Sequence, residues 1–103
     1  MKIKLSILFV FTFIFFTDGK SDEIFALGKD IFLNSGNCAT CHSLKDAGSV
    51  ANVGPNLNEI RPEFGRIQMA VTNGIGVMPS MLGILSEDEI KAVSHYVAKS
   101  ANY

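Results

Sequence analysis

Apolar residues recur at helical spacing in three separate segments of the chain. The first helix is predicted from Asp22 to Leu33, where apolar side chains return every three to four residues. Its apolar face would consist of Ile24, Leu27, Ile31 and Phe32. Gly28 lies inside this helix, at a cost of about 1 kcal/mol relative to alanine unless a close neighbour needs the space. The turn-forming residues 34–37 then end the pattern.

The second helix is marked by residues typical of helix ends. Pro62 is expected in its first turn, and Asn73-Gly74 is expected to close it. Its apolar face would consist of Phe64, Ile67 and Val71. A shorter helical turn is expected over residues 38–44, and residues 45–58 and 74–83 are expected to be loops because they are rich in turn-forming residues or lack periodicity.

The last helix is predicted from its first residues. Ser86 as the N-cap and Glu89 three residues later form a capping box, and the acidic residues between them suit the positive end of the helix dipole. The apolar stripe consists of Ile90, Val93 and Val97, with Tyr96 at its edge. No segment after residue 19 alternates apolar and polar positions over several cycles. The predicted fold class is therefore all-α.

The first 19 residues have the pattern of a secretory leader. A basic start with Lys2 and Lys4 precedes an apolar stretch from Leu5 to Phe16. This stretch is well below the roughly 20 residues that cross a bilayer as a helix. We therefore predict a signal peptide at residues 1–19, cleaved near Gly19 or Ser21, and one domain at residues 20–103 with no stable membrane span.

Composition limits what the segment after the leader can do. It is short and has no tryptophan, and domains of this size usually depend on a disulfide, a metal or a prosthetic group. A disulfide between its two cysteines would close a very small loop and would constrain the unfolded chain little. Its seven basic and nine acidic residues give about −2 without a basic block, which argues against a nucleic-acid partner.

The segment Cys38-Ala39-Thr40-Cys41-His42 is the C-x-x-C-H signature of haem attachment. Two thiols three positions apart at the start of a helical turn can each add to one vinyl group of haem. The adjacent imidazole of His42 then points at the iron. The thiols must stay reduced until they react in a compartment outside the cytosol, which agrees with the leader. The motif predicts one covalently bound haem c, attached at Cys38 and Cys41 and ligated by His42.

Three other interpretations of the motif are weaker. A thioredoxin-type redox pair requires alternating strands and helices around it, and the sequence shows none. A structural zinc site requires four ligands, whereas only Cys38, Cys41, His42 and the distant His95 follow the leader. A plain disulfide leaves His42 without a role.

The sixth ligand of the iron decides between electron transfer and gas or peroxide chemistry. Met78 is the first candidate, because it lies in a non-periodic segment where glycines allow a close backbone approach and Pro79 stiffens the chain. Met81 is the runner-up. Met69 falls inside the second helix and is interpreted as a core or surface filler. His95 lies off the apolar stripe and is interpreted as an exposed histidine.

Taken in order, these elements resemble a class I c-type cytochrome. The resemblance rests on Gly28 and Phe32 in the first helix, the C-x-x-C-H motif, Gly54-Pro55-Asn56-Leu57, Asn73-Gly74 leading to Met78-Pro79, and Tyr96 in the last helix. It covers nearly the whole segment after the leader. It implies a cytochrome c fold, with three main helices and loops wrapped around one haem.

The resemblance also implies roles for residues outside the motif. The first and last helices would cross near Gly28 and Tyr96, which supplies the close neighbour that a mid-helix glycine needs. The carbonyl of Pro55 would accept a hydrogen bond from the ring nitrogen of His42 that faces away from iron, which fixes the ring and raises its basicity. Leu57 would pack on the haem face.

With His42 and Met78 both bound, the iron has no open site. The sequence thus predicts a non-catalytic one-electron carrier in the periplasm, between a donor dehydrogenase or membrane complex and an acceptor oxidase or other cytochrome. Residues 53–57 and 73–79 are also similar to the cytochrome subunits of periplasmic sulfite dehydrogenases. A dedicated electron-accepting subunit is the alternative, and a haem sensor or peroxidase-like enzyme is a third. A monomer or the small subunit of a heterodimer is expected.

Overall fold

The computed structural model describes residues 19–103, so the predicted leader lies outside the described residues except for Gly19. The helices are α1 (Gly19–Leu33), α2 (Leu57–Ile60), α3 (Phe64–Asn73) and α4 (Glu87–Ser100). The strands β1 (Ser43–Leu44) and β2 (Ser49–Val50) form a short antiparallel ladder. The all-α prediction is confirmed, with α1, α3 and α4 as the three main helices. Within residues 19–103, no helix has the length and apolarity needed to cross a membrane.

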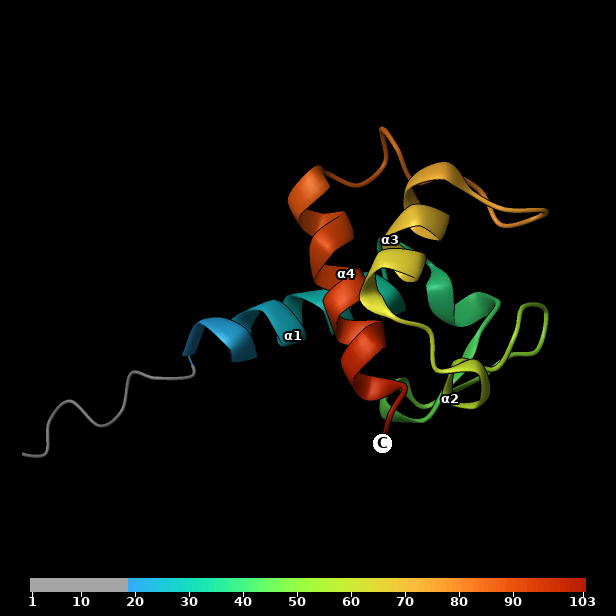
Figure 1. Ribbon diagram of the computed structural model, residues 1–103, viewed down its shortest axis with the longest axis horizontal. Coiled ribbons are helices and arrows are strands. Elements are labelled where there is room, and N and C mark those ends of the chain that lie inside the picture. The colour runs from blue at the N-terminus through green and yellow to red at the C-terminus, as the bar shows by residue number, and fades with distance from the viewer. Residues whose placement is uncertain (1–18) are drawn as a thin grey trace, which may run out of the picture.

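Helices α1 and α4 cross at a point that requires a glycine (Figure 1). A Cβ placed on Gly28 would lie 2.5 Å from the Cβ of Tyr96 and closer still to the carbonyl oxygen of Ala92. The Tyr96 ring is fully buried, and it makes edge-on contacts with the rings of Phe25 and Phe32 at centroid distances of 4.9 Å and 5.8 Å. The crossing that the resemblance implies is present, and it explains the glycine in the middle of α1.

The face of α1 that contacts α4 differs from the one predicted. Ile31 and Phe32 are buried as expected, but Ile24 and Leu27 are 38% and 43% exposed. The side of α1 that contacts α4 instead contains Phe25 and Gly28, because the glycine is the point of closest approach between the two helices. Apolar spacing alone selected the neighbouring face and was wrong for the first half of α1.

Two helix starts also differ from the prediction. α1 is already helical at Gly19, the first described residue, three residues before the predicted start at Asp22. α3 begins at Phe64 with Glu63 as its N-cap, so Pro62 precedes the helix instead of lying in its first turn. Phe64 is 39% exposed, because it stands at the very start of the helix. The remaining two residues of the predicted α3 face are buried.

The segment between α1 and α3 is more ordered than predicted. The helical turn expected over residues 38–44 is a 3₁₀ turn of only three residues, Cys38–Thr40, because residues 43–44 pair with residues 49–50. A second 3₁₀ turn covers Lys45–Ala47, and α2 starts before the predicted loop ends. Strands of two residues leave no alternation pattern for a sequence analysis to detect.

The start of α4 follows the prediction closely. The Ser86 hydroxyl oxygen accepts from the backbone N–H of Glu89 at 3.1 Å, and the Glu89 carboxylate accepts from the backbone N–H of Ser86 at 2.8 Å. Ile90, Val93 and Val97 are buried as the stripe predicted. The capping box therefore fixes both the position and the orientation of α4.

The interpretation of His95 as an exposed residue was wrong. Its Nε2 atom is buried, and it has no hydrogen-bond partner among residues 19–103. The first turns of α1 cover this side of α4, so that His95 lines a pocket of about 350 Å³ that also includes Phe25 and Asp46. A position outside the apolar stripe of α4 is shielded here by a second helix.

Asp46 ties the segment after the C-x-x-C-H motif to the helix crossing. Its carboxylate accepts a hydrogen bond from the Tyr96 hydroxyl at 2.7 Å and lies 3.4 Å from the Lys29 ammonium. Burial, followed by the hydrogen bond to Asp46, raises the pKa of the Tyr96 phenol above its ordinary value. The neutral phenol therefore keeps its proton and keeps donating to Asp46 across the physiological pH range.

Candidate functional site

Cys38, Cys41 and His42 lie on a tight turn directly after α1. The N–H of Gly36 bonds back to α1 at 2.7 Å, and Asn37 adopts a left-handed conformation with φ of 57°. The chain thereby reverses and enters a 3₁₀ turn. The N–H groups of Cys41 and His42 both donate to the carbonyl oxygen of Cys38, at 3.1 Å and 3.0 Å. The motif is thus folded into a single turn, and all three of its reactive side chains project from that turn or from the residue that follows it.

Both cysteines are free, half-buried thiols. Burial raises the pKa of the Cys38 thiol to about 11. The sulfur of Cys38 is therefore protonated at neutral pH until it reacts. A Cβ on Gly36 would lie 3.2 Å from this sulfur, so the glycine leaves the thiol the space that it occupies.

The ring of His42 is held through one nitrogen. Its Nδ1 lies 2.8 Å from the carbonyl oxygen of Pro55, as the resemblance implies. A carbonyl can only accept, so Nδ1 carries a proton, and in the neutral ring the lone pair is on Nε2. The loop is tied to the motif a second time, because the N–H of Gly54 donates to the carbonyl oxygen of Cys41 at 2.7 Å. The arrangement leaves Nε2 as the nitrogen that can bind a metal.

Gly54 is a site residue whose role the sequence analysis missed. A Cβ at this position would lie 2.7 Å from Cε1 of His42 and 3.0 Å and 3.1 Å from its two ring nitrogens. The backbone of Gly54 therefore lies close against the His42 ring. The one sequence feature that pointed to a role for this glycine was its position directly before Pro55. The resemblance to a family included Gly54 but assigned it no contact with His42.

Gly54→Ala is expected to weaken the support of His42. The added methyl group would overlap the ring, so either the ring or the loop must shift, at a cost of about 1 to 3 kcal/mol. Guanidinium unfolding of the haem-loaded protein measures this loss, and the reduction potential reports the altered ligand. Asn52→Ala, an exposed change in the same loop, is the control and should match the wild type. Equal stability and potential in the two variants would contradict the role of Gly54.

Leu57 is the first residue of α2 and belongs to the buried core, with 7% of its surface exposed. Asn56 caps the helix, because its side-chain oxygen accepts from the N–H of Asn58 at 2.9 Å. The side chain of Asn58 in turn accepts from the N–H of Lys45 at 2.8 Å. These contacts fix the segment that follows Pro55. Packing of Leu57 on a haem face stays a prediction.

Met78 directly follows a two-residue turn, Gly76-Val77, in the segment between α3 and α4. Ile75 and Met78 exchange backbone hydrogen bonds of 3.0 Å and 2.9 Å, with Gly76 at a φ of 57° and Val77 at the tip. Gly74 ends α3 with a φ of 77°, and a Cβ there would lie 2.8 Å from the carbonyl oxygen of Met78. The glycines thus allow the tight turn that presents Met78, whose half-buried side chain packs against the hydrophobic core.

Met81 is anchored more firmly to the end of α3. Its N–H donates to the carbonyl oxygen of Val71 at 2.9 Å. The Ser80 hydroxyl donates to the carbonyl oxygen of Thr72 at 2.6 Å. Met81 is also half-buried and packs against the core. Met78 and Met81 both stay candidates for the sixth ligand on these contacts.

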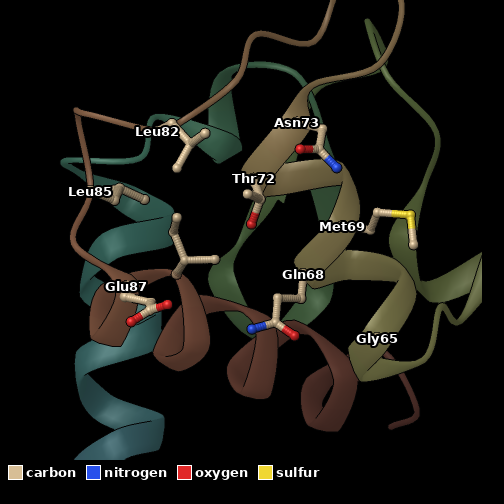
Figure 2. A pocket seen from close by; sticks show the side chains of 9 residues that line it. Gly65, Gln68, Met69, Thr72, Asn73, Leu82, Leu85 and Glu87 are labelled. Carbon is tan, nitrogen blue, oxygen red and sulfur yellow. The ribbon is translucent and has the colours of Figure 1, made fainter.

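Met69 occupies a different place. It is 64% exposed on α3, and it lines a groove of about 520 Å³ between α3, the loop at Leu82–Leu85 and the start of α4 (Figure 2). The residues of this groove include neither the C-x-x-C-H motif nor Met78 or Met81. Of the two roles that the sequence left open for Met69, core filler or surface filler, its exposure supports the second.

The donors assembled here fit a covalently attached haem. Two free thiols lie on one turn with a histidine whose Nε2 is available. A glycine backbone packs against the imidazole, where any other residue would displace the ring. A thioether donor is available from Met78 or Met81, both of which pack against the apolar core. Electron-transfer haem of this kind is attached through two thiols, and its iron is bound by an imidazole and a thioether. The chain supplies all of these groups.

Comparison with known proteins decides the family. The model of the family described as cytochrome C oxidase, cbb3-type, subunit III matches residues 24–97. Cytochrome c6 of Euglena gracilis is 39% identical over 82 residues, which cover 72% of this chain and 90% of the relative. The chain is a small class I c-type cytochrome. Cytochrome c6 of Microcystis aeruginosa is 38% identical over 80 residues, covering 72% of this cytochrome and 94% of the relative.

A solved structure supports the same assignment. The c-type cytochrome SorU from Sinorhizobium meliloti aligns with a TM-score of 0.74 and 50% sequence identity, covering 78% of this cytochrome and 93% of that chain. The cytochrome c fold and the covalently bound haem c that the sequence predicted are therefore confirmed. The individual roles of Cys38, Cys41, His42, Pro55, Leu57 and Met78 stay predictions.

Proposed function

We propose that this cytochrome carries single electrons between redox proteins of the periplasm, with His42 and Met78 as the axial ligands of its haem iron. The observation that supports the proposal is the hydrogen bond from His42 Nδ1 to the carbonyl of Pro55, because it leaves Nε2 as the nitrogen free for iron. The half-buried thioether of Met78 supports the second ligand. Met81 is the alternative for that position.

The residues of the chain set the properties of the electron carrier. Bound haem supplies a one-electron couple between ferrous and ferric iron. Pro55 and Gly54 hold the imidazole of His42 in one orientation, so the ligand does not reorganise when the charge changes. A thioether ligand favours the ferrous state and raises the potential. Apolar neighbours such as Leu57 lower the local dielectric, which disfavours the more highly charged ferric state in the same direction.

The absorption spectrum and the binding of carbon monoxide test this function. The ferric protein is expected to show the long-wavelength band of methionine bound to ferric iron, and the reduced protein is expected not to bind carbon monoxide at neutral pH. Both results follow if the porphyrin, His42 and Met78 together fill all six coordination positions of the iron, so that none is open to another ligand. Absence of the band, together with ready binding of carbon monoxide, would instead favour the haem sensor or peroxidase-like enzyme.

A dedicated subunit of a periplasmic dehydrogenase is the second candidate. The resemblance of residues 53–57 and 73–79 to the cytochrome subunits of periplasmic sulfite dehydrogenases favours it. In that case a molybdenum subunit performs the oxidation and this cytochrome accepts the electrons. Size-exclusion of native extract separates the cases: co-elution with a larger dehydrogenase supports the subunit, and a lone small peak supports the free carrier.

The proposed location rests on the leader at residues 1–19, which has a basic start and an apolar stretch. Cleavage near Gly19 or Ser21 would release residues 20–103 into the periplasm as a monomer or as the small subunit of a heterodimer. The mass of the protein isolated from cells tests cleavage and haem attachment together. A mass that includes the leader would contradict release from the membrane.

A further inference from the structure

Asn73-Gly74 is the one place in this chain where an asparagine precedes a glycine. Asparagine is a thermolabile residue, because the backbone nitrogen of the following residue can attack its side-chain carbon Cγ. A side chain on that following residue obstructs the attack, and glycine has none. The pair ends α3, as predicted, so a chemically reactive dipeptide lies directly before the turn that presents Met78.

The side chain of Asn73 has room to reach the nitrogen of Gly74. Asn73 is exposed and lines the groove of about 520 Å³ beside Met69. Figure 2 shows its amide at the edge of this groove, on the last turn of α3. A backbone hydrogen bond restrains the reaction, since the N–H of Gly74 donates to the carbonyl oxygen of Ala70 at 2.8 Å. Helix ends open locally at little cost, and each opening of this last turn frees the nitrogen.

The reaction needs only water besides the chain itself. The nitrogen of Gly74 loses its proton and bonds to Cγ of Asn73, and the side-chain amide leaves as ammonia. The product is a succinimide ring. Water then opens the ring at one of its two carbonyl carbons. Attack at Cγ gives aspartate, whereas attack at the main-chain carbon gives isoaspartate, in which the chain continues through Cγ and is longer by one methylene group.

An extra methylene group does not fit the segment that carries Met78. The two ends of this segment are held together, because the Ser80 hydroxyl donates to the carbonyl oxygen of Thr72 at 2.6 Å. Within it, Gly74 packs so closely that a Cβ there would lie 2.8 Å from both the carbonyl oxygen of Met78 and the backbone nitrogen of Ser80. A longer backbone directly before Gly74 should therefore push the segment outward and break the two hydrogen bonds between Ile75 and Met78.

We propose that Asn73 is a modification site at which spontaneous loss of ammonia forms isoaspartate, and that this change withdraws Met78 from the haem iron. The second part rests on the proposed function above, in which Met78 is an axial ligand. The modified cytochrome has an open sixth position, so its iron binds external ligands. The pair Asn73-Gly74 thereby limits the working life of the electron carrier.

Ageing of the holoprotein in mildly alkaline buffer tests the proposal. Peptide mass mapping locates the deamidation, and labelling by a protein isoaspartate methyltransferase measures isoaspartate at residue 73. Isoaspartate is expected to accumulate there, and the long-wavelength band of the ferric protein should decline with the same rate constant. The isoaspartate form, separated by ion-exchange chromatography, should lack the band and should bind carbon monoxide when reduced.

Three variants identify the cause of the change. Asn73→Gln should slow the loss of the band by about tenfold or more, because the longer side chain is less favourably placed for attack by the next nitrogen. Asn34→Gln is the matched control and should age like the wild type, since Asn34 is also exposed and directly follows a helix, but precedes a serine. Asn73→Asp adds the carboxylate without the methylene group and should keep the band.

The other outcomes overturn the proposal. No isoaspartate at residue 73 after ageing would exclude the modification, and isoaspartate with an unchanged band would mean that the segment accommodates the longer backbone. Equal loss of the band in Asn73→Gln and the wild type would place its cause elsewhere, and loss of the band in Asn73→Asp would assign the effect to charge. Failure of the axial-ligand proposal is distinguishable: freshly purified protein would then lack the band before any isoaspartate forms, which would also overturn the link to Met78.

Discussion

Gly28→Ala is expected to destabilise the haem-loaded cytochrome by about 3 kcal/mol, at the upper end of the range for overpacked cores. The new Cβ would lie 2.5 Å from the Cβ of Tyr96 and closer still to the carbonyl oxygen of Ala92. Neither atom can rotate away, because one belongs to the backbone of α4 and the other is attached directly to it. The two helices must therefore move apart, which also loosens the contacts of Phe25 and Phe32 with the Tyr96 ring.

The matched control for this change is Gly65→Ala. Gly65 is also a helical glycine, in α3, but a Cβ there would meet nothing within 4 Å. Alanine is a better helix former than glycine by up to about 1 kcal/mol, so this variant should be slightly more stable than the wild type. Thermal unfolding of both variants is the measurement, and a loss of about 3 kcal/mol corresponds to a fall of roughly 12 to 24 °C in Tm for a domain of this size. A Gly28→Ala variant as stable as Gly65→Ala would refute the tight crossing.

The sequence predicted best those features that depend on local chemistry. The capping box of α4 involves residues only three positions apart, and it forms as expected. The C-x-x-C-H motif likewise carries its chemistry in five consecutive residues. The hydrogen bond between His42 and Pro55 spans thirteen positions, and only the resemblance to a family made it foreseeable.

Features that depend on contacts between distant elements were predicted less well. The buried face of α1 was assigned to Ile24 and Leu27, although the position of Gly28 against α4 decides which side is covered. His95 was assigned to solvent because periodicity within α4 contains no information about α1. The close contact of Gly54 with the His42 ring also escaped notice, since a missing side chain leaves no apolar or polar signal. In each case the deciding atom belongs to another element.

The choice between Met78 and Met81 has the largest consequence for function. Met78 lies in a turn closed by its own exchange of hydrogen bonds with Ile75, so its backbone does not depend on α3 beyond the turn. Met81 is fixed by its N–H to the carbonyl of Val71, and its own carbonyl oxygen accepts from the N–H of Leu85 at 2.9 Å. The backbone of Met81 is thus tied both to α3 and to the loop before α4, which favours a packing role for its side chain.

Met78→Ala is accordingly expected to abolish the long-wavelength band of the ferric protein and to lower the reduction potential by on the order of 100 mV or more, since axial ligands set haem potentials over about 0.8 V. The sixth position then opens, so the reduced variant should bind carbon monoxide. Absorption spectra and protein-film voltammetry are the measurements. Met81→Ala should keep the band and the potential but lose about 1 to 2 kcal/mol of stability, because it removes a half-buried side chain from the core.

The two variants together distinguish a ligand from a packing residue. Loss of a ligand changes the spectrum at every temperature below unfolding, whereas loss of packing lowers Tm and leaves the folded spectrum intact. Met69→Ala, at a 64% exposed position, should change neither quantity and is the control for removing a methionine. If the band instead disappears in Met81→Ala and persists in Met78→Ala, Met81 is the sixth ligand, and the turn at Ile75–Met78 serves to support it.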